Sequence, residues 1–304
     1  MQTGKKDFMG KFWTVLSNIK VSKWPFFMFY RPHSFTLKGN HTREIMKLVK
    51  PGDILVRSFN NYLNGYFMEG TFKHVGFYLS EVSEQHLKQF AQIQNPTEYN
   101  TGRQMVIYTI GDKIFLEDLI DFCRCDGLAI MRFPRQLKSL ARREIPEILQ
   151  AYFENPIKPV DEVTDEESEK NNSKKKKGKK AKEEKDEPPK EPVKPDATTL
   201  AIVKAEKDIA QHIANGKGVE FEKIFKILYR IALRQLSTPY DYDFGIDQFP
   251  GLTSTEFVYF ITKSICWNYG IEAESSRIFL KKRLVITPDM FVDGDLEEVW
   301  KSDI

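Results

Sequence analysis

The 304-residue sequence lacks several features that would assign it to a common class. No apolar run approaches the ~20 residues that a membrane-spanning helix needs, and no clean apolar block with a small-residue cleavage site marks a secretory signal. Cys123, Cys125 and Cys266 are too few for a disulfide framework and lack zinc-site spacing. We therefore expect a protein without cofactor or metal, cytoplasmic or peripherally attached to a membrane.

Charge of one sign is also scarce. The net charge of +3 is too small to indicate a nucleic-acid-binding groove, so no nucleic-acid partner is expected. Residues 161–196 contain 12 acidic and 11 basic residues but no aromatic residue, Leu, Ile or Met. Such a segment cannot bury enough apolar surface to offset its ordering entropy, which predicts a disordered, solvated insertion over residues 154–198. The lysine run at 174–177 leaves open a localisation signal or a patch for an anionic surface.

Residues 1–41 are rich in aromatic side chains. Phe8, Phe12, Leu16 and Ile19 recur at helical spacing, which predicts a helical lead-in, and residues 24–30 then read WPFFMFY. The favoured interpretation is a strap that packs across the domain, because apolar stretches usually belong to the core. The alternative is peripheral membrane contact through residues 8–30, since aromatics flanked by lysines suit the headgroup layer.

The remaining sequence alternates between strand and helix patterns. Strands are expected at residues 53–57, 73–79, 104–110, 128–133 and 277–287. Helices are expected at residues 42–50, 115–122, 135–153, 199–214, 220–236 and 255–267. Grouped strands with segregated helices indicate the α+β class. We expect residues 42–153 and 199–304 to form two parts of one domain, because each part looks incomplete alone.

Two positions could carry chemistry. His74 is the one histidine of five that starts an expected strand, where a structural role is commoner than that of a general base. Ser254 lies in a Ser/Thr cluster at the start of an expected helix. Thr253 and Glu256 fit a capping box there, whereas a nucleophile at position 254 would use the helix dipole and backbone N–H groups to stabilise an oxyanion. The residues alone favour the cap.

A resemblance shifts this balance. Residues 51–55 read PGDIL and residues 72–78 read FKHVGFY, and together they resemble the opening of the YiiX/YaeF-like permuted papain-fold amidases. That family is related to the NlpC-type cell-wall peptidases and to lecithin:retinol acyltransferase. Its members carry the catalytic histidine on an HVGIY strand, and a YD..F....D stretch leads into CSELVY, whose cysteine is the nucleophile. Residues 240–247 and 254–259 of this chain match that second region in the same order. Three shorter matches lie between the two motifs, at residues 107–109, 115–119 and 130–133.

The resemblance implies a circularly permuted papain-like (NlpC-type) fold with an antiparallel sheet and packed helices. It implies that His74 is the general base and Ser254 the attacking group, with Tyr108 as the group that orients the histidine. Tyr240 and Asp241 would then bind substrate. The expected partner is a peptide or acyl-amide substrate, cell-wall peptide included, and the sequence indicates no oligomeric state.

Serine at position 254 departs from the family pattern. A helix N-terminus and an imidazolium can hold a thiolate, but a serine hydroxyl needs concerted proton removal by a well-oriented base. We expect such a site to lose most of its rate. Three explanations stay open: an engineered inactivating change, a natural non-catalytic relative, or a slow serine nucleophile. Two other functions also stay open, a binding module of the same fold and a lipid-directed acyltransferase or phospholipase.

Overall fold

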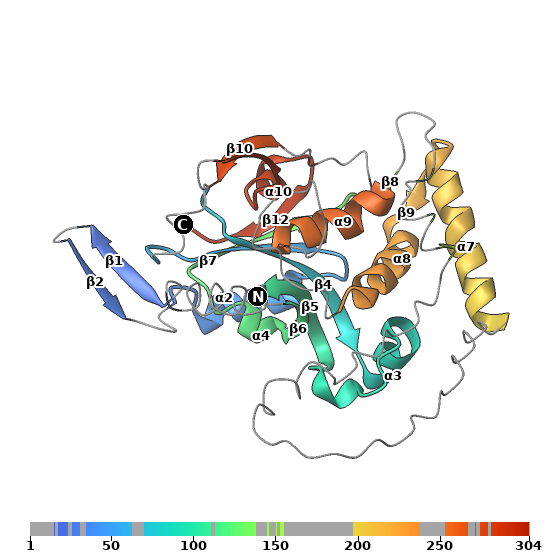
Figure 1. The fold of residues 1–304 in the computed structure, drawn as a ribbon, viewed down its shortest axis with the longest axis horizontal. Helices are drawn as coiled ribbons and strands as arrows, with labels where there is room; N and C mark the ends of the chain where they lie inside the picture. The colour runs from blue at the N-terminus through green and yellow to red at the C-terminus, as the bar shows by residue number, and fades with distance from the viewer. Residues whose placement is uncertain are drawn as a thin grey trace, which may run out of the picture.

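The computed structural model describes residues 15, 18–23, 26–30, 35–62, 70–110, 113–137, 145, 150, 153–154, 197–236, 253–266, 271, 274–278 and 281–303. Figure 1 shows how their helices and strands are arranged. The strands are β1 (Ile19–Lys23), β2 (Phe26–Tyr30), β3 (Ile54–Ser58), β4 (His74–Val82), β5 (Gly102–Ile110), β6 (Lys113–Asp118), β7 (Gly127–Arg132), β8 (Gln136–Leu137), β9 (Val219–Glu220), β10 (Glu274–Ile278), β11 (Lys281–Val285) and β12 (Glu297–Lys301). The helices are α2 (Gly39–Leu48), α3 (Glu84–His86), α4 (Leu119–Phe122), α7 (Ala197–Ala214), α8 (Phe221–Arg234), α9 (Ser254–Cys266) and α10 (Met290–Asp293), with a π-helix at Leu87–Ala91 and a 3-10 turn at Pro96–Glu98.

A six-stranded sheet forms the centre of the molecule. Its strand order is β12-β7-β3-β4-β5-β6, and every neighbouring pair is antiparallel. Short connections, such as the one between β5 and β6, favour antiparallel neighbours because they need no crossover. The predicted α+β class with an antiparallel sheet and packed helices is confirmed.

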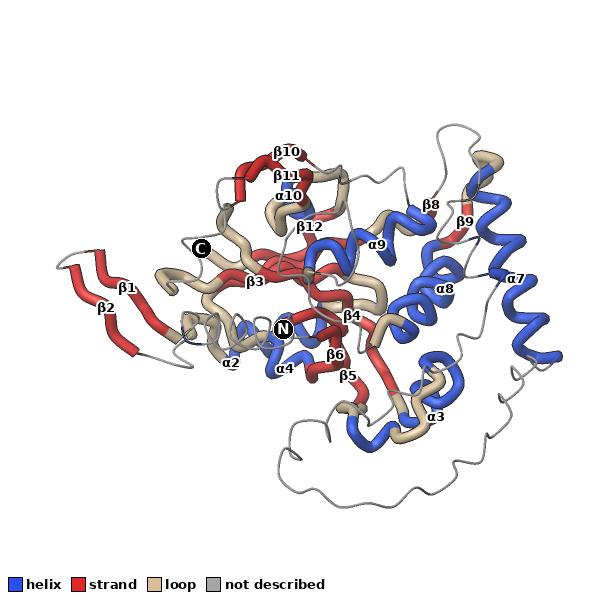
Figure 2. The backbone as a smooth tube through the Cα atoms, viewed as in Figure 1, coloured by secondary structure: helices blue, strands red, loops and turns tan. Residues whose placement is uncertain are grey.

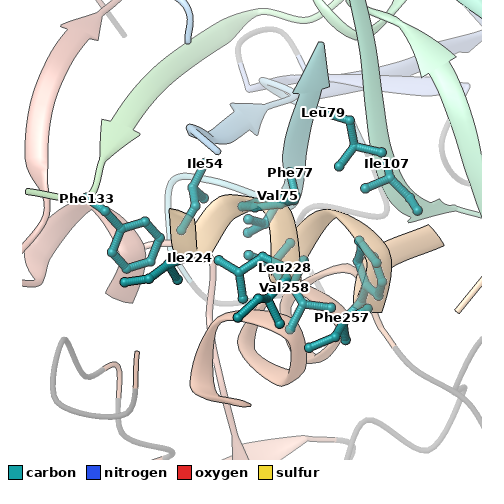
Figure 3. Close-up of a cluster of buried hydrophobic side chains, with 14 of the residues drawn as sticks. Ile54, Val75, Phe77, Leu79, Ile107, Phe133, Ile224, Leu228, Phe257 and Val258 are labelled. Carbon is teal, nitrogen blue, oxygen red and sulfur yellow. The ribbon is translucent and has the colours of Figure 1, made fainter. Parts of the chain in front are cut away.

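One face of the sheet is covered by helices from late in the sequence. Alternate residues of β4, Val75, Phe77 and Leu79, are buried on this face, as expected for a strand with a side-chain period of two. They belong to the same apolar cluster as Leu228 of α8 and Phe257 of α9 (Figure 3). Residues on both sides of the charged segment at 161–196 therefore contribute to one core.

The opposite face carries a second core. Tyr78, Val106 and Tyr108 are buried there against Ile45 of α2 and Phe122 of α4. The tube in Figure 2 shows α2 and α4 on one side of the sheet and α8 and α9 on the other. The sheet is thus enclosed between two helical layers. Among the described residues, no helix is both long and apolar enough to cross a membrane.

The N-terminal prediction was wrong where the structure describes it. Residues 19–23 and 26–30 form an antiparallel hairpin, β1 and β2, in place of the end of a helix followed by a strap. β-branched and aromatic residues, which are dense in this stretch, favour extended backbone. Most of the helix expected over residues 8–19 lies outside the described residues.

Three further elements differ from the prediction. The expected helix over residues 115–122 begins only at Leu119, because residues 113–118 form β6 and pair with β5. Alternating burial of Ile114 and Leu116 is the strand signal that the helix assignment overlooked. The expected strand over residues 277–287 is a hairpin of β10 and β11. The expected helix over residues 135–153 starts instead with β8, and most of its remainder lies outside the described residues.

Candidate functional site

Ser254 is the first residue of helix α9, and the residues around it cap that helix. The carboxylate of Glu256 accepts a hydrogen bond from the backbone N–H of Thr253 at 2.8 Å, and the Thr253 hydroxyl accepts one from the N–H of Glu256 at 3.2 Å. This reciprocal pair is the predicted capping box. The capping box fixes the direction in which the helix starts, and it is formed by Thr253 and Glu256 without the hydroxyl of Ser254.

The Ser254 side chain contacts the strand that carries His74. Its Oγ accepts a hydrogen bond from the backbone N–H of Val75 at 3.4 Å, near the upper limit for such a bond. Ser254 is only 5% exposed, so this contact lies inside the molecule. Two segments about 180 residues apart in sequence therefore meet where β4 begins.

The His74 imidazole lies on the α2/α4 side of the sheet. His74 pairs with Arg57 of β3, and strand alternation places it on the same face as Gly76 and Tyr78. Its ring packs edge-on against Phe59, with 5.5 Å between ring centroids. Within the described part of the chain, no hydrogen bond joins this ring to the Ser254 hydroxyl. The structure thus brings Ser254 to the backbone next to His74 but does not pair the two side chains.

Electrostatics keep His74 neutral. Burial, together with the positive charges of Arg57 and Lys73, lowers the pKa of its imidazole to about 3. A neutral imidazole can accept a proton, but a base this weak drives proton transfer poorly. The same surroundings disfavour an imidazolium, so a stable thiolate–imidazolium pair would not form here without rearrangement.

Arg57 dominates the charge near His74, and the sequence analysis did not identify it. Its guanidinium carbon lies 4.2, 4.6 and 5.2 Å from the ring centroids of Phe122, Tyr108 and Phe59. Its Nη1 donates a hydrogen bond to the carbonyl of Phe122 at 3.1 Å. The only sequence signal was an arginine that follows three apolar residues within a strand expected to be buried.

The described hydrogen bond of the Tyr108 hydroxyl goes to Glu117, and none joins it to His74 among the described residues. This hydroxyl donates to Oε2 of Glu117 at 2.6 Å, and the same carboxylate oxygen lies 3.6 Å from Nη1 of Arg57. Burial raises the pKa of the Tyr108 hydroxyl, which therefore stays protonated and acts as a donor. Tyr108 and Glu117 hold Arg57, and through it they set the charge beside His74. The other predicted substrate contacts, Tyr240 and Asp241, lie outside the described residues.

Cys123 and Cys125 offer no alternative nucleophile. Cys123 and Cys125 are buried free thiols. Burial raises the pKa of Cys123 to about 12 and also raises that of Cys125, so neither forms a thiolate near neutral pH. Among the residues that the structure describes, no group of three or more His, Cys, Asp or Glu side chains could hold a metal ion.

A scan against protein-family models found no match for the chain, and searches of curated proteins and of solved structures found none either.

Proposed function

We propose that the chain is an amidase- or peptidase-type hydrolase scaffold of the permuted papain kind, with Ser254 and His74 at the nucleophile and base positions. The proposal rests on the resemblance of two ordered motifs and on one contact, the hydrogen bond from Val75 N–H to Ser254 Oγ. That contact puts the start of α9 beside the start of β4, which is the juxtaposition that a nucleophile helix and a histidine strand require.

The corresponding reaction runs through an acyl intermediate. The Oγ of Ser254 would attack the carbonyl carbon of an amide while His74 takes the hydroxyl proton. The C–N bond then breaks, and the amine leaves with that proton. Water, deprotonated by the same imidazole, would hydrolyse the ester and restore the hydroxyl. His74 would have to turn toward Ser254 for this sequence, and its low basicity predicts a slow reaction with serine at position 254.

Acylation of position 254 tests the proposal. p-Nitrophenyl acetate is a small activated ester that reports nucleophilicity without demanding a specific substrate pocket. Wild type, Ser254→Cys and Ser254→Ala are treated with it, and peptide mass mapping locates the acetyl group. We expect residue 254 of the Ser254→Cys variant to be acylated at least roughly tenfold faster than Ser254 of the wild type, because a thiol is the better nucleophile at neutral pH.

The same measurement in a His74→Gln background distinguishes activation of residue 254 by His74 from mere accessibility of residue 254 to the ester. We expect acylation of the Ser254→Cys variant to fall when His74 is replaced, with Cys123 and Cys125 unlabelled throughout as internal controls. If the thiol at position 254 reacts at the same rate with and without His74, the two residues do not form a nucleophile–base pair.

A non-catalytic binding module is the second candidate. Its specific support is the lowered pKa of His74, which removes the imidazolium that this class of site uses. In that case Ser254→Cys would fold normally yet acquire no acyl group, because the thiol would remain protonated beside a weak base. Circular dichroism of each variant distinguishes this result from loss of structure.

A further inference from the structure

The hairpin of β1 and β2 stands away from the rest of the molecule. Its two five-residue strands pair along their whole length, from Ile19 with Tyr30 to Lys23 with Phe26. In Figures 1 and 2 the hairpin extends outward from the side of the sheet and packs against neither helical layer. A two-stranded hairpin in water is marginally stable by itself, so its persistence needs support from elsewhere.

The base of the hairpin is fixed to the body. Val21 N–H donates to the carbonyl of Asn61 at 2.8 Å. Lys20 lies 3.6 Å from the buried carboxylate of Asp126, and its ammonium sits 4.5 Å from the ring centroid of Tyr62. These contacts hold the first strand in place, so the hairpin projects from a defined point.

Exposed apolar side chains gather on this part of the chain. Five large apolar side chains are mostly exposed among the described residues, and three of them lie within residues 15–30: Val15, Met28 and Tyr30. Met28 is 57% exposed and Tyr30 is 70% exposed. They are two positions apart on β2, so they share one face of the hairpin. A cluster of exposed apolar groups marks an interaction surface.

The sequence segment that contains the hairpin carries charge of one sign. Residues 8–43 contain no Asp or Glu but six basic residues: Lys11, Lys20, Lys23, Arg31, Lys38 and Arg43. The remainder of the chain then holds 40 basic and 43 acidic residues and is slightly negative. The stretch that bears the projecting hairpin is therefore complementary to an anionic surface, whereas the rest of the chain carries a net negative charge.

We propose that the β1–β2 hairpin docks the protein on an anionic lipid bilayer. Met28 and Tyr30 enter the interfacial layer, where a thioether chain and an amphipathic phenol are both well accommodated, and the net positive charge of residues 8–43 attracts the lipid phosphates, while Lys20 stays paired with Asp126. A bilayer fits better than a protein groove because the charge is spread over 36 residues and is not confined to one pocket. This inference does not depend on the proposed hydrolase chemistry.

Sedimentation with sucrose-loaded vesicles tests the proposal on the full chain. Vesicles are made from phosphatidylcholine alone or with about a third phosphatidylglycerol, a content that gives a strong negative surface potential. We expect the wild type to pellet with the anionic vesicles and to be released as salt screens the attraction. We expect the double variant Met28→Glu, Tyr30→Glu to bind about tenfold more weakly or worse.

The matched control carries the same substitutions at the other two exposed apolar sites. Ile120→Glu with Leu200→Glu adds the same charge to side chains that are 53% and 51% exposed and lie on α4 and α7, outside the hairpin. This control should bind as the wild type does. Equal binding by both double variants, or no wild-type binding to anionic vesicles, overturns the proposal.

A second measurement avoids the glutamate substitutions and reads the wild type and one conservative aromatic variant. Vesicles that contain brominated lipid quench tryptophan near the interface, and Trp24 lies in the hairpin sequence between the two strands. We expect quenching in the wild type that Trp24→Phe removes. Unchanged quenching in Trp24→Phe overturns the proposal. Light scattering without vesicles gives one more contrary outcome. If the wild type is a dimer and the Met28→Glu, Tyr30→Glu variant is a monomer, the hairpin binds a second copy of the chain and the proposal is overturned.

Discussion

Burial and the positive charges of Arg57 and Lys73 lower the pKa of the His74 imidazole, and this shift has a consequence for stability. In the unfolded chain His74 takes up a proton near its ordinary pKa of 6.5, whereas in the folded chain its pKa is about 3. The unfolded state therefore binds more protons between these values, and stability is lost as the pH falls through that window.

We expect the free energy of unfolding to fall by about 1–2 kcal/mol between pH 7 and pH 5 on account of His74 alone. Urea unfolding at the two pH values measures it. The variant His74→Gln removes the titrating group and should show a correspondingly smaller loss. A loss of equal size in both proteins would show that His74 is not held neutral.

Gly76 follows His74 by two residues and has a packing role that the motif does not reveal. A Cβ at this position would lie 2.6 Å from Cγ1 of Val106 and 2.7 Å from Cε2 of Phe122. We expect Gly76→Ala to destabilise the protein by about 1–3 kcal/mol through overpacking. Gly39→Ala is the control, because a Cβ there meets nothing within 4 Å, and it should be close to neutral in the same urea titration.

At the scale of secondary-structure elements, Asp53 joins two strands and a helix. Its carboxylate accepts hydrogen bonds from Nε and Nη2 of Arg132 at 2.8 and 2.7 Å and from the N–H of Lys50 at 2.7 Å. Arg132 also donates to the carbonyl of Leu48 at the end of α2. The aspartate of the PGDIL motif thus links β3 to β7 and fixes the turn after α2.

We expect Asp53→Asn to reduce the free energy of unfolding by about 2–4 kcal/mol, because it leaves the partly buried guanidinium of Arg132 without its counter-charge. The control Asp121→Asn removes an exposed aspartate–arginine pair with Arg124 and should change stability by less than about 1 kcal/mol. Similar effects of the two substitutions in urea unfolding would contradict a structural role for the Asp53–Arg132 pair.

The sequence predicted elements whose pattern is set locally. Helices α8 and α9 and strands β3, β4, β5 and β7 were expected close to where they lie, because apolar periodicity marks a buried face. The sequence prediction failed where pairing with a distant strand decides the backbone conformation. Residues 113–118 have helix-compatible composition, yet pairing with β5 makes them a strand. β12 was missed because its outer positions are charged and only a partner at β7 makes it extended.

The candidate site shows the same division. The capping box at Thr253 and Glu256 was readable from four consecutive residues, and the structure contains it. The proximity of Ser254 to the histidine strand came from the resemblance alone, since no local pattern links residues so far apart. Arg57 stayed unnoticed because its effect depends on three aromatic rings and a carboxylate that only the fold assembles around it.

At the scale of the whole molecule, one core spans both halves of the sequence. Val75 and Phe77 from the sheet pack in the same cluster as Leu228 and Phe257, which come after the charged segment. Without α8 and α9 the sheet would expose an entire apolar face to water.

We therefore expect residues 1–160, expressed alone, to show no cooperative urea transition by near-ultraviolet circular dichroism. Mixing them with a separately made fragment of residues 190–304 should restore one, because the two pieces bury a shared face. A fragment of residues 1–160 with the unfolding midpoint of the full chain would contradict the shared core.

The position of β12 matters while the protein is being made. The other five strands of the sheet have been synthesised by residue 132, but β12 follows roughly 160 residues later. At usual rates of translation the backbone edge of β7 waits on the order of 10–30 s for its partner. An unpaired edge strand invites association with other nascent chains during that interval, so chaperone supply should govern the yield of this protein more than its final stability does.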